Sequence, residues 1–230
     1  MQPYFLPYLP YFQLINSVDK FIIYDDVNYI KSGWINRNNI LINQKASMFT
    51  VPLIKASSFS KINDLQIDLY LFNFWKKKFI KSINQYYSKA PYFNEVFEVI
   101  NRILIVEDNH TISNFVVKAL KEVVNYLQIN TIIVESSSIY NNSHLKSYQR
   151  VIDICIQESA TVYINPIGGL LLYDKFIFKQ SSLELSFLKS NNYIYQQFTD
   201  DFVPLLSIID VLMFNSVDSF KFILNNFELI

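Results

Sequence analysis

Three short apolar runs in this sequence are each followed by residues that could do chemistry. FIIY is followed by two aspartates, TIIVE by three serines, and TVYI by an asparagine and the chain's only pair of adjacent glycines. Carboxylates can accept hydrogen bonds from hydroxyls, bind Mg²⁺ or take a proton from an amine. Serine hydroxyls, backbone amides and glycine turns suit anionic groups. These residue types therefore favour a site for a polar, partly anionic ligand.

The aspartate pair, Asp25 and Asp26, is the first candidate for catalysis. Its place at the end of an expected strand favours a functional role, although one carboxylate could instead cap a turn while the other is solvated. His144 is a candidate general base, because imidazole is the side chain that most readily exchanges a proton near neutral pH, and an incidental surface histidine is the alternative. The two histidines and the single cysteine lie far apart in the sequence, so we do not expect a metal site.

The segment WINRN carries groups that could bind a substrate. Arg37 offers a two-pronged donor for phosphate or carboxylate, and Asn36 and Asn38 can both donate and accept hydrogen bonds. Trp34, which begins the segment, could stack on a sugar or base ring. Alternatively, Arg37 is a structural partner of the aspartate pair.

The two later loops are expected to contribute further substrate contacts. The candidates there are Ser137, Ser138, Asn165, Gly168, Gly169 and Tyr173. Glycine permits positive φ and a close approach of the backbone to a ligand, and this chain has three glycines in all. The alternatives are an ordinary serine-rich loop and a turn that simply needs glycine.

The elements that must position these residues alternate between helical and strand patterns. We expect helices over 12–17, 72–87, 94–105, 113–127, 147–159 and 172–180, and strands over 20–24, 48–53, 131–135, 161–165 and 183–188. In the longest helix, Phe72, Trp75, Phe79, Ile83 and Tyr86 should share one buried face. Ser113 is expected to cap the helix that it begins, and two more helical segments close the chain.

This order predicts one α/β domain over residues 1–230. Its sheet should be largely parallel and Rossmann-like, flanked by helices, with an added C-terminal helical portion. Open parallel sheets bind ligands outside the carboxyl ends of their strands. The three polar loops should therefore meet at one edge of the sheet.

Composition narrows the class of protein. The 230 residues are 51% hydrophobic, and 20 basic residues balance 20 acidic ones, so a polyanionic partner is not expected. The single cysteine, Cys155, forms no disulfide framework. No apolar run approaches the roughly 18 to 20 residues that span a bilayer, and the N-terminus lacks the pattern of a signal peptide. We expect a cytoplasmic protein.

The opening, QPYFLPYLPYFQLINSVDKFIIYDDVNYIKSGWINRN, resembles the start of the WbqC-like family. The resemblance continues through VPL, WKKKF, YYSKAPYF, the serine turn, YINPIGGLLLYDKFIF and FVPLLSIIDVLMFN. It places Gln2 and Tyr4 toward the end of the strand that precedes the aspartates. Pro10 stands where the family usually has glycine. Met1 stands where relatives usually have an apolar strand, so we expect the sheet edge beside Gln2 to be less well ordered.

Genes of this family typically lie in clusters for O-antigen and other surface polysaccharides. The resemblance implies a soluble enzyme that modifies a nucleotide-linked amino sugar by aminoacyl (glycyl-type) or other acyl transfer to the amine. Its partners would be the nucleotide-linked sugar and an acyl or aminoacyl donor, with nucleic acid involved only if the donor is an aminoacyl-tRNA. The alternative is a non-catalytic subunit that binds the sugar or another enzyme of the pathway.

A weaker similarity concerns cofactors. A strand, a polar turn into a helix and a second strand ending in an acidic residue resemble the start of nucleotidylyltransferase-like folds, although their His-x-Gly-His turn is absent. On fold grounds alone, this similarity allows ATP and Mg²⁺ as cofactors.

Overall fold

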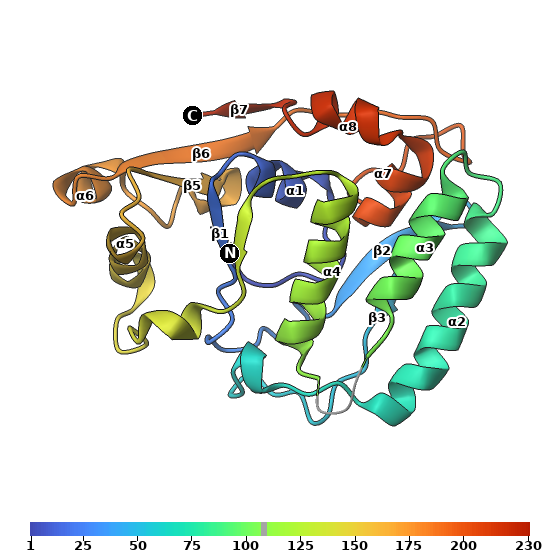
Figure 1. Ribbon diagram of the computed structural model, residues 1–230, viewed down its shortest axis with the longest axis horizontal. Coiled ribbons are helices and arrows are strands. Elements are labelled where there is room, and N and C mark those ends of the chain that lie inside the picture. The colour runs from blue at the N-terminus through green and yellow to red at the C-terminus, as the bar shows by residue number, and fades with distance from the viewer. Residues whose placement is uncertain (107–109) are drawn as a thin grey trace.

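The computed structural model describes residues 1–106 and 110–230 (Figure 1). The helices are α1 (Leu9–Asn16), α2 (Leu69–Tyr87), α3 (Phe93–Ile103), α4 (Ile112–Tyr126), α5 (Ser147–Gln157), α6 (Lys175–Gln180), α7 (Ile208–Phe214) and α8 (Val217–Ile223). The strands are β1 (Lys20–Ile22), β2 (Arg37–Ile42), β3 (Lys45–Thr50), β4 (Ile132–Val134), β5 (Val162–Pro166), β6 (Glu184–Ser190) and β7 (Phe227–Leu229). Three 3₁₀ turns, η1 (Ile62–Asp64), η2 (Ser137–Tyr140) and η3 (Ile167–Gly169), complete the described elements.

The strands form three small sheets rather than one large parallel sheet. β1 and β4 pair in parallel, with Phe21 opposite Ile133. β5 and β6 also pair in parallel, and β7 joins β6 antiparallel. β2 and β3 form a separate antiparallel pair. The mixed α/β class is thus confirmed, but a Rossmann-like sheet is not found in the described parts of the chain.

Strand β3 overlaps the expected strand over 48–53, but its partner β2 and the hairpin that joins them were not predicted. The two-residue turn of this hairpin consists of Asn43 and Gln44, whose φ values are 49° and 63°. Positive φ at these positions is typical of hairpin turns, because their backbone twist matches the twist of the strands. The usual signal for such a turn is Asn-Gly, and glutamine replaces the glycine here. As a result, Arg37 and Asn38 lie in a strand and not in a loop after a parallel strand.

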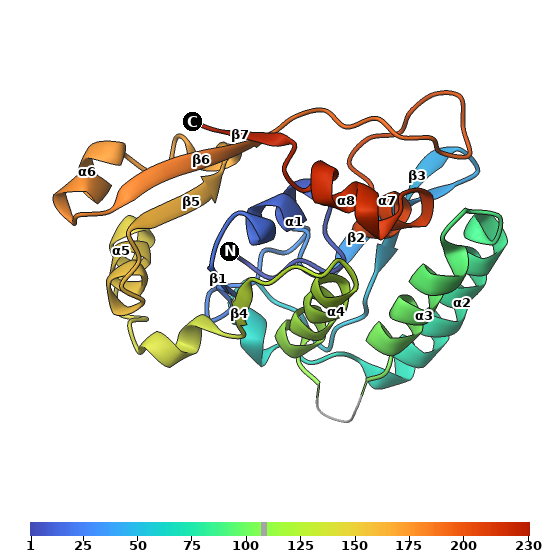
Figure 2. The same cartoon turned by 45° about the horizontal axis from the view of Figure 1, so that its top comes forward.

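Helices α2, α3 and α4 lie side by side over the main core (Figures 1 and 2). α2 begins after Asp68, whose carboxylate accepts a hydrogen bond from Leu71 N, and it ends before Pro91. Phe72, Phe79 and Ile83 of the expected face are buried, whereas Trp75 is only partly buried and Tyr87 is fully buried where Tyr86 was expected. Within the described residues, no helix combines the length and apolar composition needed to cross a membrane.

A second, smaller apolar cluster joins α5 and α6 to β6, at the left of Figure 1. Strand β6 connects the two clusters because successive side chains point to opposite faces. Phe187 packs in the smaller cluster and Leu188 in the main core. The sheet that carries β5 is therefore held against the rest of the protein.

The proline-rich opening is fixed by hydrogen bonds to its backbone and does not form a loose arm. Phe5 N donates to Ile35 O at 3.0 Å. The carbonyl of Leu6, a residue with φ of 45°, accepts from Asn38 Nδ2 at 2.6 Å and from Ser207 Oγ at 2.8 Å. Three segments that are distant in sequence are thus joined at one carbonyl.

A buried carboxylate, Asp210, holds α7 to α2 and to the segment before α7. Tyr87 and Tyr195 each donate a hydroxyl to it at 2.6 Å, and Gln197 Nε2 donates at 2.8 Å. Tyr87 Oη also accepts from Leu41 N of β2 at 2.7 Å. Burial raises the pKa of Asp210 above its usual range, against the opposing effect of these donors.

We predict that Tyr87→Phe lowers the free energy of unfolding by about 2 kcal/mol, because it removes a hydrogen bond to a buried carboxylate and an acceptor for Leu41 N. The matched control, Tyr86→Phe, removes a hydroxyl from the partly buried neighbour and should cost less than about 0.5 kcal/mol. Urea unfolding of both variants measures the difference, and equal losses would contradict this account.

Candidate functional site

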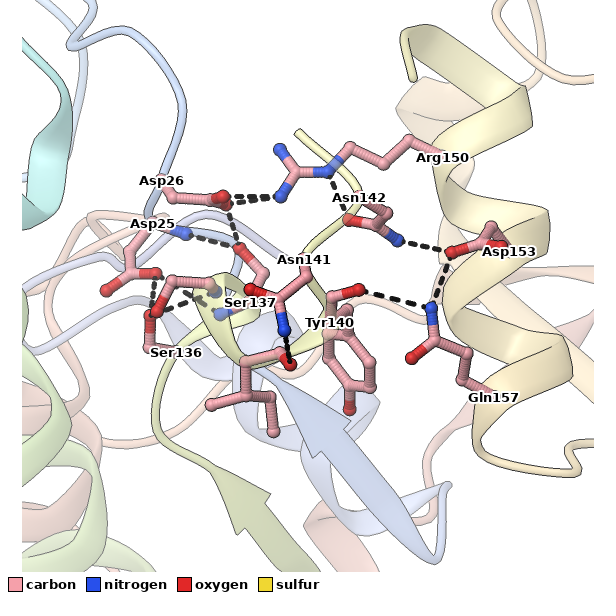
Figure 3. Close-up of polar contacts among 12 residues, drawn as sticks. Asp25, Asp26, Ser136, Ser137, Tyr140, Asn141, Asn142, Arg150, Asp153 and Gln157 are labelled. Carbon is pink, nitrogen blue, oxygen red and sulfur yellow. Dashed lines mark hydrogen bonds and ion pairs between the residues drawn. The ribbon is translucent and has the colours of Figure 1, made fainter. Parts of the chain in front are cut away.

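The carboxyl ends of β1 and β4 bring the aspartates and the serines together, as the sequence predicts (Figure 3). Asp25 Oδ1 accepts from Ser136 Oγ at 2.7 Å and from Ser137 N at 3.2 Å. Asp25 Oδ2 accepts from Ser113 Oγ at 2.6 Å. The side chain is buried and both of its oxygens are engaged, so Asp25 fastens the strand ends to each other and to α4.

Ser113 does not cap α4 as expected. Thr111 is the N-cap, with its hydroxyl accepting from Asn114 N at 3.2 Å. Ser113 lies in the first turn instead, buried, with its hydroxyl directed to Asp25. A carboxylate beside the first turn is favoured by the positive end of the helix dipole.

Asp26 forms a buried ion pair with Arg150 of α5. Arg150 Nη2 donates to the two Asp26 oxygens at 2.7 and 2.5 Å, and Ser137 Oγ donates to Asp26 Oδ1. Arg150 Nε donates to Asn142 Oδ1 at 2.8 Å. Arg150 is only 3% exposed and Asp26 only 7%. We call Asp25, Asp26, Ser136, Ser137 and Arg150 the carboxylate cluster.

The cluster keeps Asp26 ionised. Burial raises its pKa, but the Ser137 hydroxyl and the Arg150 guanidinium together outweigh burial, and the pKa lies below its usual range. A carboxylate with a lowered pKa is a poor base for an amine. It remains an effective acceptor that can orient an N–H or O–H group.

The loop after β5 approaches the same place. The Arg150 guanidinium lies 4.8 Å from the centre of the Tyr24 ring. The pKa of Tyr24 is raised, mainly because the side chain is buried. Arg150 lowers this pKa, and the nearby Tyr173 raises it further. Tyr173 in turn packs against Tyr163 of β5, with ring centres 5.9 Å apart. The loops after β1 and β4 therefore meet at the carboxylate cluster, and Tyr173, which follows β5, lies near Tyr24.

The glycine pair acts differently from expectation, because neither glycine has positive φ. A Cβ on Gly169 would lie 2.3 Å from Asn165 Oδ1, whereas a Cβ on Gly168 would meet nothing within 4 Å. Asn165 Nδ2 donates to the Tyr163 hydroxyl at 2.7 Å. Gly169 is thus needed for close packing against Asn165, and Gly168 is exposed.

Three predicted residues, Tyr4, Trp34 and Arg37, lie together with Tyr8, which was not predicted, in a second group. Tyr4 packs against Tyr8 and Trp34, with ring centres 5.8 and 6.1 Å apart. Arg37 lies over Trp34 at 5.8 Å and donates its Nε to Gly33 O at 2.7 Å. Trp34 is 47% exposed. We call Tyr4, Tyr8, Trp34 and Arg37 the aromatic–arginine surface.

Arg37 forms no ion pair with any described residue, so it is not the partner of the aspartate pair. Asn36 and Asn38 are buried, and their amides are already engaged. Asn36 donates to Val51 O at 2.7 Å, and Asn38 donates to Leu6 O. These two asparagines hold the hairpin and the opening in place.

The aromatic–arginine surface lies near the carboxylate cluster. Met1 O accepts from Tyr24 N at 2.8 Å, and Tyr4 follows three residues later, a span of at most about 11 Å. Gln2, in this span, accepts from the Tyr11 hydroxyl through its backbone carbonyl at 2.9 Å. Ser138 is exposed and shares a 2.8 Å hydrogen bond with Ser136.

His144 is exposed in the turn before α5 and takes no part in the described hydrogen bonds of the carboxylate cluster. The residue that sequence reasoning missed is Arg150, because its neighbours in SYQRVIDICIQES read as an ordinary amphipathic helix. The one hint in the sequence was a single arginine within an apolar run. Its partner, Asp26, lies 124 positions away, so only the folded structure identifies the ion pair.

The carboxylates do not fit a Mg²⁺ ion in this arrangement. All four oxygens of Asp25 and Asp26 already accept protein hydrogen bonds. Over residues 1–106 and 110–230, no group of three or more His, Cys, Asp or Glu could hold a metal ion. A pocket of about 870 Å³ lies elsewhere, on α8, and includes no cluster residue.

We predict that Gly169→Ala destabilises the protein by about 1 to 2 kcal/mol, because the new methyl group must displace the Asn165 side chain from Tyr163. Gly168→Ala is the matched control and should be neutral within about 0.5 kcal/mol. Thermal and urea unfolding compare them. A larger loss at Gly168 would contradict this packing.

Comparison with known proteins agrees with these motifs. The model of the WbqC-like protein family matches residues 2–222. The chain is 31% identical over 214 residues to uncharacterized protein Rv1507c of Mycobacterium tuberculosis, covering 92% of this chain and 90% of the relative. No solved structure matches the chain significantly. The chain belongs to the WbqC-like protein family.

Proposed function

We propose that the protein is an enzyme of surface-polysaccharide biosynthesis that attaches an acyl or aminoacyl group to the amine of a nucleotide-linked amino sugar. The observation that carries the proposal is the meeting of the β1 and β4 loops with α5 at a buried ion pair, with a partly exposed aromatic–arginine surface nearby. Parallel strands place ligand-binding groups at their carboxyl ends.

The aromatic–arginine surface suits the nucleotide part of such a substrate. Arg37 uses its Nε on Gly33, which leaves its terminal nitrogens to donate to phosphate oxygens. Trp34 and Tyr4 offer ring faces to a base or sugar. Because Met1 is hydrogen-bonded to Tyr24 and Tyr4 follows three residues later, a sugar attached to the bound nucleotide would lie toward the carboxylate cluster.

In this proposal, Asp26 stays ionised and is too weak a base for the sugar amine, because its pKa is lowered. Among the described residues, its Oδ2 accepts from Arg150 alone, so one lone pair is left to accept from an N–H or O–H group of the sugar. Asp25 is more deeply buried, at 2% exposed, and serves as a structural lock that joins Ser113, Ser136 and Ser137. No step in the proposal uses a metal. The acyl donor would approach from the side of Tyr173 and the glycine turn.

A second candidate is a non-catalytic subunit that binds another protein of the same pathway. Its support is an exposed apolar stretch after β5, where Leu171 is 99% exposed, Leu172 69% and Phe176 67%. An exposed apolar patch of this kind is typical of an interaction site. Leu171→Ser with Leu172→Ser would abolish binding of the partner protein while leaving sugar binding unchanged.

We predict that a UDP- or dTDP-linked amino sugar raises the apparent melting temperature of the protein by binding the folded state. Trp34→Ala and Arg37→Gln should each weaken this binding at least about tenfold, because a stacking face or a charged donor is lost. Calorimetric titration gives the affinities.

Two matched controls accompany these variants. Phe222→Ala removes an aromatic ring that is 81% exposed on α8. Lys45→Gln removes a cation at the far end of the hairpin that carries Arg37. Both controls should bind like the parent protein. If none of the nucleotide sugars binds, or if the controls lose as much affinity as the test variants, the proposed substrate class is wrong.

A further inference from the structure

The outer face of α2 carries a group of exposed residues that the proposed site does not use. Residues three, four and seven positions apart share one face of a helix. In α2 this spacing places the exposed residues away from the buried Phe72, Phe79 and Ile83, which face the main core. We call the exposed group the α2 stripe, and its members are Tyr70, Leu71, Phe74, Lys77, Lys78 and Lys81.

One end of the α2 stripe is apolar. Tyr70 is 73% exposed and Phe74 is 52% exposed, and their ring centres lie 5.0 Å apart. Leu71 is exposed next to them. Ile54 is also exposed, and its backbone N donates to Gln66 O at 2.9 Å, two residues before the N-cap of α2. Exposed apolar side chains that gather in this way mark an interaction surface.

The other end of the α2 stripe is positively charged. The helix contains four lysines and no acidic residue, so the chain's net charge of zero conceals a local positive surface. Lys76 donates to Leu104 O at 2.8 Å and therefore points toward the end of α3. Lys77, Lys78 and Lys81 are exposed and form no ion pair with any described residue. These three lysines suit a partner that presents many negative charges.

We propose that the α2 stripe binds the surface of an anionic lipid bilayer, with α2 parallel to the membrane plane. Helix α2 is the outermost element on its side of the molecule in both ribbon views, so a flat surface can reach it (Figures 1 and 2). Amphipathic helices that combine aromatic and leucine side chains with lysines bind bilayers in this way. The aliphatic Leu71 and Ile54 favour lipid over a nucleic acid, whose bases stack on aromatic rings. This inference does not rest on the proposed function.

The experiment measures how the full chain sediments with two kinds of vesicle, one of phosphatidylcholine alone and one of equal parts phosphatidylcholine and phosphatidylglycerol. We expect binding to the anionic vesicles to be at least about tenfold tighter, and to weaken as salt is added. Lys77→Gln with Lys81→Gln should weaken it at least about tenfold, because two attractive charges are lost. Leu71→Ser with Phe74→Ser should weaken it by a similar factor, because less apolar surface is inserted.

Matched control pairs lie on and just before α6, at the opposite edge of the molecule (Figure 1). Lys175→Gln with Lys179→Gln removes two exposed lysines that are also four positions apart on a helix. Leu171→Ser with Phe176→Ser removes an exposed leucine and an exposed phenylalanine. Both control pairs should bind the anionic vesicles like the parent protein.

Phe74→Trp tests insertion directly, because it keeps an aromatic ring at this position and does not depend on the folding of a serine variant. Its fluorescence, compared with that of the parent protein, should shift to the blue when anionic vesicles are added. Absence of binding to these vesicles, or equal losses in the test and control pairs, would overturn the proposal. An unchanged affinity in the Leu71 and Phe74 pair, or no blue shift, would indicate adsorption through charge alone, as on a nucleic acid, and would also overturn it.

Discussion

The buried ion pair between Asp26 and Arg150 is the constraint on which the arrangement of the site depends. A charge removed from water costs several kcal/mol unless its partner is present with good geometry. Asp26 follows β1 and Arg150 lies in α5, and the two side chains meet only when the end of β1 and the start of α5 are side by side. Ser137 of η2 donates to the same carboxylate, so the loop after β4 must lie there too.

Around this pair, the residues that mark the family divide into two groups. Asp25, Asn36, Asn38 and Leu6 fasten segments to one another, with their polar groups engaged inside the protein. Trp34 is exposed, and Tyr4 and Arg37 are partly exposed beside it. The distinctive opening therefore serves mainly to hold the strand ends and the hairpin in register, and a smaller part of it faces outward. This division explains why a proline-rich segment is so closely tied to the site.

Many of the helices and strands, and part of the site, could be predicted from the sequence because local residue patterns determine them. The helices α2 to α5 and the strands β1, β4, β5 and β6 follow from apolar spacing, and the meeting of the aspartates with the serines follows from parallel pairing. The β2–β3 hairpin was not predicted because Gln44 replaces the usual glycine in its turn. The role of Arg150 was not predicted because sequence alone does not distinguish a buried charged residue from a surface one until its partner is known. The division into three small sheets depends on tertiary packing, which short periodic patterns do not encode.

A double-mutant cycle on Asp26 and Arg150 tests the central claim most directly. Asp26→Asn, Arg150→Gln and the double variant would be compared with the parent protein by urea unfolding at neutral pH. If the pair organises the site, the two changes are strongly coupled, and the interaction energy is about 2 kcal/mol or more. Effects that add within about 0.5 kcal/mol would contradict this account and show that the two residues act independently.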